Sequence, residues 1–363
     1  MKLQRRFKAG GIALIIVLVV ITVLAILAGG FAYSMKVETT LARNASLDAD
    51  LEWLGRSGVE LAKWVLAEES AGPLGAVDCL MKKWAGGPGD TNSPVAGVPL
   101  DHYELGAGWI SVKIVDADRK FNINVADEVV LRQALTLIGV DAAEQAVIID
   151  SILDWRDPDN ATHMSGTESD FYRGLQPPYR AKNGPLDDLS ELLLVRGVTP
   201  AMYWGSAAAG HLQVLNRPAS RSHFDEPIYA TGLVDLFTAL SGGRVNINTA
   251  SAKVLQLLAP QIDETMANAI ISGPGGRAGP DGVDGTEDDM PFRAPQELGR
   301  IQLPAILELV HLPQFSRFVS TRSLVFEVEV DAHLGSYHRK YIAVLRRANP
   351  RDIQTLTFYW KSS

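Results

Sequence analysis

One uncharged stretch constrains this chain more than any other feature: from Ile12 to Met35 there is no charged side chain. An apolar helix of about 20 residues spans a bilayer, whereas the apolar region of a secretory signal peptide has only about 7–15 residues. Four cations lie among the first eight residues, and positive flanks stay on the cytoplasmic side. We therefore expect a single-pass anchor in the inner membrane, with the N-terminus in the cytoplasm and the body in the periplasm.

The junction in front of this stretch is specific. A basic segment ends in Gly10-Gly11, and the apolar residues begin at once with Ile12. This pattern resembles the processing site of type IV prepilins and pseudopilins, in which a membrane peptidase cuts after the glycine and methylates the new N-terminus. The resemblance implies cleavage after Gly11, which makes Ile12 the first mature residue; Gly10 is the neighbouring possibility. An uncleaved signal anchor is the alternative.

The helix is predicted to continue beyond the membrane. No proline occurs between Lys36 and Glu69, and apolar residues recur there close to a 3.6-residue period. A membrane helix that runs into an amphipathic helix is the shape of the first helix of a pilin. Two separate helices with a bend near Gly29-Gly30 are the alternative.

Four segments alternate apolar and polar residues and are predicted strands: 109–116, 323–330, 337–345 and 353–360. Between the first of them and the others, helix-like runs dominate. The sequence therefore predicts an α+β fold. In it, a pilin-like N-terminal transmembrane and amphipathic helix lies beside a small antiparallel sheet, which a large all-α insertion interrupts.

The predicted domain boundaries follow this division. Residues 1–11 are a leader and 12–35 a transmembrane helix; 36–119 hold the pilin-like helix, a loop and the first strand; 120–315 are the helical insertion, and 316–363 complete the sheet. This order is similar to that of the minor pseudopilin K family of type II secretion systems, whose pilin domain carries a large helical insertion.

Position 16 supports the same resemblance. The family pattern usually has Glu as the fifth mature residue, whereas cleavage after Gly11 makes Ile16 the fifth. A carboxylate in the bilayer is costly unless it is paired, and in pilin filaments the N-terminal amine of a neighbour is thought to neutralise it. The K subunit is the pseudopilin that lacks this Glu and is placed at the filament tip. The resemblance implies that Ile16 packs within such a tip.

Two stretches of the predicted insertion echo each other. Residues 121–126 read FNINVA and residues 245–250 read VNINTA, each before a helix-like run. The element resembles the start of helix-hairpin-helix units, in which Asn or Thr can cap a helix. A membrane-anchored periplasmic DNA receptor is therefore a competing function. The net charge is −8, and because the first eleven residues carry four cations the remainder carries −12, which disfavours nucleic acid as a partner.

A cluster of acidic residues follows one predicted helix. The stretch LDWRDPDN contains Asp154, Asp157 and Asp159, and Gly-Thr-Glu168 comes shortly after it. The K family carries a similar stretch and is associated with bound calcium in this domain. Hard oxygen ligands at short spacing suit Ca²⁺, so we expect Asp157, Asp159 and Glu168 to bind it, with Asp154 a fourth candidate. A solvated acidic loop with helix-capping Asp residues is the alternative.

A second acidic loop is a weaker candidate for an ion. Two glycines separate carboxylates that do not follow the EF-hand spacing; they are Asp281, Asp284, Glu287, Asp288 and Asp289.

No catalytic signature accompanies these motifs. The seven histidines form no H-E-x-x-H pair, and G-x-S-x-G, the P-loop and G-x-G-x-x-G do not occur. We therefore expect a non-enzymatic assembly protein.

The resemblance implies a minor pseudopilin that caps the pseudopilus tip together with the minor pseudopilins I and J and primes assembly for protein export. Its other implied partners are the major pseudopilin, the prepilin peptidase, the inner membrane, and possible contacts with secreted cargo or the outer-membrane channel. A minor pilin of a type IV pilus is the nearest alternative.

Overall fold

The computed structural model describes residues 10–207 and 229–361. The α-helices are α1 Gly10–Glu69, α2 Glu128–Ile138, α3 Ala142–Arg156, α4 Ser169–Arg173, α5 Pro200–Trp204, α7 Leu233–Leu236, α8 Ala252–Gln256, α9 Glu264–Ser272, α10 Pro304–Val310 and α11 Pro313–Phe318. The strands are β1 Tyr103–Leu105, β2 Gly108–Asp116, β3 Phe121–Asn122, β4 Phe237–Thr238, β5 Val245–Asn246, β6 Val319–Ser320, β7 Val325–Leu334, β8 Tyr337–Asn349 and β9 Asp352–Lys361. Short 3-10 turns include η1 Lys83–Ala85, η2 Ala117–Arg119 and η3 Ile123–Val125.

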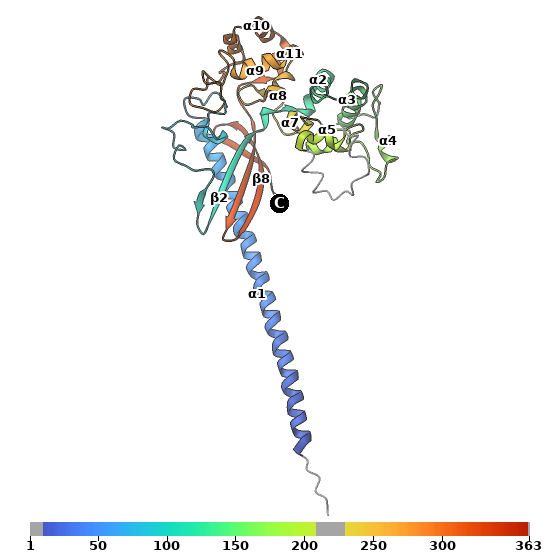
Figure 1. Ribbon diagram of the computed structural model, residues 1–363, viewed down its shortest axis with the longest axis vertical. Coiled ribbons are helices and arrows are strands. Elements are labelled where there is room, and N and C mark those ends of the chain that lie inside the picture. Colours follow the sequence, from blue (N-terminus) through green and yellow to red (C-terminus); the bar gives the residue numbers. More distant parts are fainter. Residues whose placement is uncertain (1–9, 208–228, 362–363) are drawn as a thin grey trace, which may run out of the picture.

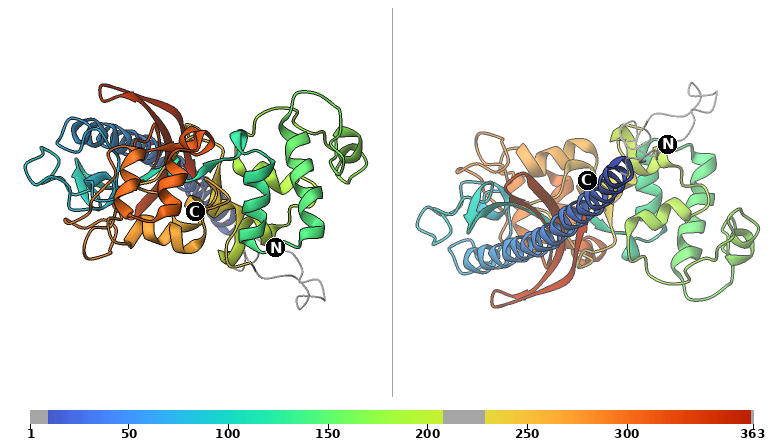
Figure 2. Two further views of the ribbon diagram at one scale, coloured as in Figure 1. Left: turned by 90° about the horizontal axis from the view of Figure 1, so that it is seen from above. Right: turned by 90° about the horizontal axis from the view of Figure 1, so that it is seen from below.

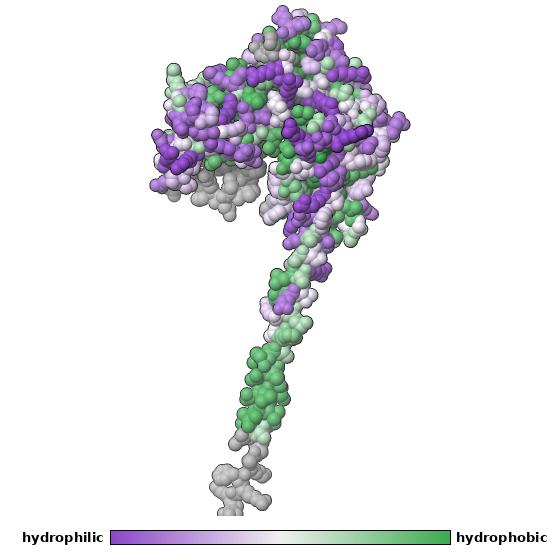
Figure 3. All heavy atoms as spheres, turned by 180° about the vertical axis from the view of Figure 1, so that it is seen from behind, coloured by the Kyte–Doolittle hydropathy of each residue, from purple (hydrophilic) through white to green (hydrophobic). Residues whose placement is uncertain are grey.

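Helix α1 runs without a break from the predicted membrane segment into the body of the protein (Figure 1). Its first half projects alone, and the side chains from Ala13 to Arg43 are exposed. Figure 3 shows apolar side chains over the visible face of the lower part of this helix, with polar side chains nearer the body. Among the described residues, α1 is the one helix long and apolar enough to cross a membrane. The prediction of one helix without a break at Gly29-Gly30 is confirmed, and the helix is compatible with a single-pass anchor.

The second half of α1 packs against a five-stranded antiparallel sheet of order β1-β2-β7-β8-β9. Two glycines bring the helix close to the strands. A Cβ at Gly55 would lie 2.4 Å from the Tyr341 ring, and one at Gly58 would lie 2.4 Å from a Val330 methyl group. The buried side chains of this core come from α1, from alternate positions of β2, β7 and β8, and from Trp84 and Val95 in the loop between α1 and β1. All four predicted strands are present, and β1 is a fifth strand that the sequence did not reveal.

The insertion leaves and re-enters the sheet between neighbouring strands. Asp116 of β2 lies opposite Phe326 of β7, so the chain in between forms a separate body with its own apolar core. In Figure 2, α2 and α3 stand to one side of the sheet, whereas α8 to α11 lie over its end. Both groups lie at the end of the molecule opposite the exposed half of α1 (Figure 1).

The prediction of an all-α insertion is wrong, because the insertion contains two short parallel strand pairs, β3 with β4 and β5 with β6. One strand of each pair, β3 or β5, begins one of the two echoing stretches. These pairs escaped prediction because two residues are too few to show an alternating pattern.

The echoing stretches make the same contacts in both copies. Asn122 and Asn246 each accept a bond from the backbone two residues on, which starts a tight turn. The second asparagine of each copy then makes two bonds to one distant backbone segment: Asn124 with Leu186, and Asn248 with Phe292. The asparagines of both stretches are thus explained by hydrogen bonds that hold distant segments of the fold together.

Candidate metal centre

The first acidic cluster lies where α3 ends and the chain crosses to α4. Asp141 caps the start of α3 by accepting a bond from Ala143 N, 2.8 Å away. Near the other end, Trp155 is buried and packs edge-on against Tyr172 of α4, with ring centroids 5.2 Å apart. This contact holds both ends of the connecting loop, so the loop's carboxylates are fixed close together.

Three predicted ligands converge. Carboxylate oxygens of Asp157, Asp159 and Glu168 all lie within 4.8 Å of one another. A second group of the same kind joins Asp157 with Asp154 and His163. Asp157 therefore lies between an all-oxygen set and a set that contains an imidazole.

Glu168 carries the strongest sign of a missing partner. Its residue is only 7% exposed, and neither carboxylate oxygen has a hydrogen-bond donor in the described part of the chain. One oxygen of Asp157 is in the same condition. A buried carboxylate without a partner is strongly unfavourable, so this arrangement needs either a proton or a cation.

The pKa shifts agree with this geometry. Burial and then the neighbouring carboxylates Asp154 and Asp157 raise the pKa of Glu168. Burial, followed by Asp159 and Asp154, likewise raises the pKa of Asp157. A divalent cation would remove both causes, because it attracts the charged form and replaces lost hydration. Three converging carboxylates with free oxygens fit the oxygen-rich coordination of Ca²⁺.

Asp154, the fourth candidate ligand, lies in the second group and already has hydrogen-bond partners in its own loop. It is fully buried, and its oxygens accept bonds from the backbone of His163, at 3.0 Å, and of Thr167, and from the His163 ring. A Cβ at Gly166 would lie 2.0 Å from this carboxylate, so only glycine fits there. Asp154 thus fixes the loop that carries the converging carboxylates, through its bonds with His163 and Thr167.

His163 was missed by the sequence analysis. Its hydrogen bond to Asp154 raises the pKa of the His163 imidazole, which favours its cationic form beside the carboxylates. The residue lies in the stretch ATHMS, which matches no ligand spacing, and only the folding of the loop brings it back to α3.

The second acidic loop is not brought together in this way. Asp284 forms a two-bond ion pair with Arg277, at 2.9 and 2.8 Å. Asp281, Asp288 and Asp289 accept bonds from the loop's own backbone or from Thr286. No three of the loop's carboxylates, all of which are described, form a converging group. These four carboxylates of the second loop already have hydrogen-bond or ion-pair partners, so they do not need a cation in that place.

The predicted processing site lies at the start of α1. The helix begins at Gly10, so Gly11 and Ile12 lie in its first turn, whereas the rest of the leader lies outside the described residues. Ile16 is 57% exposed on the apolar surface of the unpartnered half of α1.

Comparison with known proteins shows which proteins these features are similar to. Residues 112–205, which contain the whole first acidic cluster, match the family model of type II secretion system protein K. The type II secretion system protein K of Aeromonas hydrophila is 26% identical over 215 residues, 54% of this chain and 61% of the relative. The chain is thus similar to type II secretion system K proteins. The predicted resemblance is confirmed.

Further matches extend the likeness to the K proteins. The protein K of Pseudomonas aeruginosa is 28% identical over 201 residues, which are 51% of this chain and 57% of the relative. The matches therefore span about three fifths of the length of these relatives. A chain from the crystal structure of the GspK-GspI-GspJ complex of enterotoxigenic Escherichia coli superposes with a TM-score of 0.58 at 18% identity, over 89% of this chain and 99% of that chain. The mixed helix and sheet fold is thus shared with that chain.

Proposed function

We propose that this chain is a non-enzymatic minor pseudopilin of the K type, which caps the pseudopilus of a type II secretion system together with minor pseudopilins I and J. The observation that carries this proposal is the likeness of fold to a chain of a K-I-J complex, which covers 89% of this chain and 99% of that chain. The local likeness to several K proteins supports it independently.

The shape of the molecule suits the end of a filament. One end of α1 is an unpartnered apolar rod, and the other end carries the sheet and the whole insertion (Figure 1). Apolar rods can pack side by side with the corresponding helices of other subunits in a bilayer. The insertion lies over the end of the sheet opposite the exposed half of α1. A further subunit of a continuing filament would have to stack in that place.

Ile16 fits the same position. Between Gly11 and Val37 the chain has no acidic residue, so no carboxylate in the membrane helix demands an amine from a neighbour. A subunit of this kind can start an assembly, and the next subunit can be added beneath it without a missing charge pair.

The acidic cluster is proposed to hold Ca²⁺ through Asp157, Asp159 and Glu168. The cation would supply positive charge to buried oxygens that now have no donor. Asp154 and His163 would position the loop, and binding would fix residues 157–168 against α3 and α4.

The proposed location follows from the charge pattern. The cationic leader keeps the N-terminus in the cytoplasm, α1 crosses the inner membrane, and the body lies in the periplasm. The prepilin peptidase would cut after Gly11 and methylate Ile12. The major pseudopilin would then extend the filament, and the exposed insertion would face cargo or the outer-membrane channel.

Two alternatives are less well supported. The matching proteins named above are type II secretion proteins, so a minor pilin of a type IV pilus is not favoured. The acidic body disfavours a DNA receptor.

Co-assembly tests the proposal. The full chain would be co-expressed with the I and J proteins and the prepilin peptidase encoded in the same genome, and purified through a tag on its C-terminus. We expect I and J to co-purify with it, and secretion to fail when its gene is deleted. Recovery of the chain without I and J, together with normal secretion in the deletion strain, would contradict the proposal.

A further inference from the structure

Part of strand β2 has a free edge. β1 pairs only with Gly108 to Ile110, and beyond it the Val112 N–H donates to Leu100 O, 2.6 Å away. Backbone groups of alternate residues point to the same edge of an antiparallel strand, so Ile114 and Asp116 direct theirs to the side that β1 leaves open. Outside the β2–β7 ladder, no described group bonds to the N–H or C=O of Ile114.

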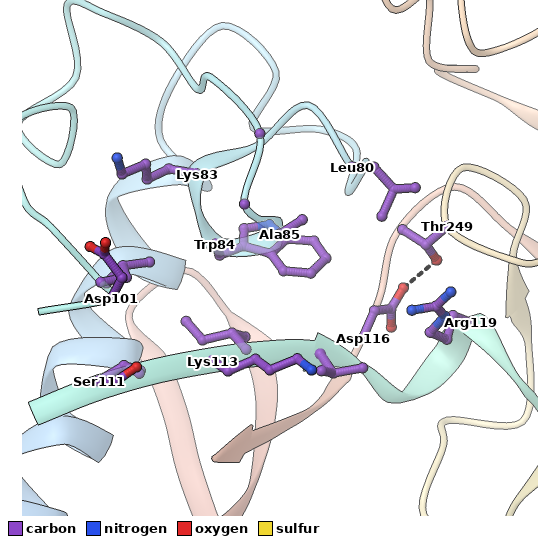
Figure 4. A pocket seen from close by; sticks show the side chains of 16 residues that line it. Leu80, Lys83, Trp84, Ala85, Asp101, Ser111, Lys113, Asp116, Arg119 and Thr249 are labelled. Atoms are coloured by element: carbon purple, nitrogen blue, oxygen red, sulfur yellow. Dashed lines mark hydrogen bonds between the residues drawn. The ribbon is translucent and has the colours of Figure 1, made fainter. Parts of the chain in front are cut away.

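A cavity of about 490 Å³ follows this free edge. One wall is β2 from Ser111 to Asp116, and the other is the turn from Lys83 to Gly87 (Figure 4). Trp84 lines the cavity between them and packs edge-on against Phe326, with ring centroids 5.3 Å apart. The β2-edge groove, as we call this cavity, thus offers an apolar wall beside unpaired backbone groups.

The β2-edge groove carries excess positive charge. Lys83, Lys113 and Arg119 line it, and no ion pair within the described ranges involves any of the three. The opposing acids are Asp101 and Asp116. Asp116 already has partners, because it accepts bonds from Ser323, at 2.6 Å, and from Thr249, at 2.5 Å, the latter drawn in Figure 4.

We propose that the β2-edge groove binds an extended acidic segment of another protein, which pairs as an additional strand with the free backbone groups of Ile114 and Asp116. Strand addition obtains its affinity from the backbone bonds of an exposed edge and its selectivity from the pockets beside it. The two residue steps from Ile114 to Asp116 correspond to about 7 Å of strand, so the edge pairs with only a few residues of such a segment. The three unpaired cations select carboxylates over cationic side chains. The groove would bind such a segment whether or not the chain caps a filament.

The test uses the purified full chain in detergent and a fluorescent heptapeptide of sequence SEVEVES. We expect saturable binding, at least tenfold tighter than that of SKVKVKS. Two further peptides, N-methylated either on the valines or on the glutamates, each block one peptide edge. One of them should bind at least tenfold more weakly and the other should bind about as well as the parent.

Variants of the protein locate the site. The double charge reversal Lys113→Glu with Arg119→Glu should weaken binding about tenfold. Arg351→Glu alters an exposed cation at the β8–β9 turn and should leave binding unchanged. Amide hydrogen exchange at Ile114 and Asp116 should slow when SEVEVES binds. Equal effects of the two methylated peptides, or binding that survives the double reversal, would overturn the proposal, as would no binding at millimolar peptide.

Discussion

Arg347 of β8 and Asp78 of the loop after α1 form an ion pair in which the side chains are only 2% and 1% exposed. Asp78 also receives a bond from Ser323 N at 2.9 Å, and Lys82 lies 3.4 Å from it. The pair therefore joins the end of α1, the point where the insertion re-enters the sheet, and the longest strand. Burial opposes ionisation of Asp78, but Lys82 and Arg347 outweigh it and lower its pKa.

The first prediction concerns this pair. Asp78→Asn removes the carboxylate that pairs with buried Arg347 and Lys82, and we expect a loss of about 3–5 kcal/mol in the free energy of unfolding. Denaturant titration of the full chain measures it. The control is Asp48→Asn, whose partner Arg339 is 2.7 Å away but whose own side chain is 60% exposed, and which should cost less than about 1 kcal/mol. Equal costs for the two substitutions would show that the buried junction has no special role.

The second prediction concerns Asp116. Burial, and then the charge of Asp118, raise the pKa of Asp116 to about 7. Because the folded pKa lies above the unfolded value, the stabilising form is the protonated one. Its contribution is complete below about pH 4 and is lost as the pH rises through about 7.

Asp116→Asn removes this dependence. Its free energy of unfolding, relative to that of the unaltered chain, should rise by about 1 kcal/mol between pH 6 and pH 8. Denaturant titrations at several pH values measure the difference. A constant offset between the two proteins across that range would contradict the raised pKa.

The third prediction concerns the acidic cluster. Without added metal, Glu168→Gln should be at least as stable as the unaltered chain, because it removes a buried charge that has no partner. With Ca²⁺ at about 100 times its dissociation constant, the unaltered chain should gain about 2.7 kcal/mol, and the variant should not. Thermal unfolding with EDTA or CaCl₂ provides the measurement. Glu287→Gln, in the second acidic loop, is the matched control and should respond like the unaltered chain. A calcium response that persists in Glu168→Gln would place the ion elsewhere.

The fourth prediction concerns the contact between α1 and the sheet. Gly58→Ala places a Cβ 2.4 and 2.9 Å from the two Val330 methyl groups, so the helix or the strand must shift. We expect a loss of about 1–3 kcal/mol in the free energy of unfolding. Gly30→Ala, with nothing within 4 Å of the new Cβ, should leave it unchanged. If Gly58→Ala is also neutral, the close approach of α1 to β7 is not required.

The parts of the fold that sequence predicted are those with long periodic signals. The uncharged run from Ile12 to Met35 and the apolar repeat after it specify α1 by themselves. The long strands were visible through their alternation. β1 has three residues and β3 to β6 have two each, so their strand character depends on partners far along the chain.

The candidate metal centre likewise has features that the sequence predicts and features that it does not. The convergence of Asp157, Asp159 and Glu168 was predictable because they lie close in sequence and belong to a stretch that resembles one of the K family. The anchoring role of Asp154 and the approach of His163 depend on how the loop returns to α3. The difference between the two acidic loops lies in Arg277 and Thr286, which pair with carboxylates of the second loop, and composition does not show such pairing.

The pseudopilin assignment is tested by the intact mass and N-terminal sequence of the membrane form, made together with its prepilin peptidase. We expect a mature chain that begins at Ile12 with a methylated amine, and therefore has Ile16 as its fifth residue. An uncut chain that keeps its cationic leader would contradict the pseudopilin assignment and leave a simple signal-anchored protein.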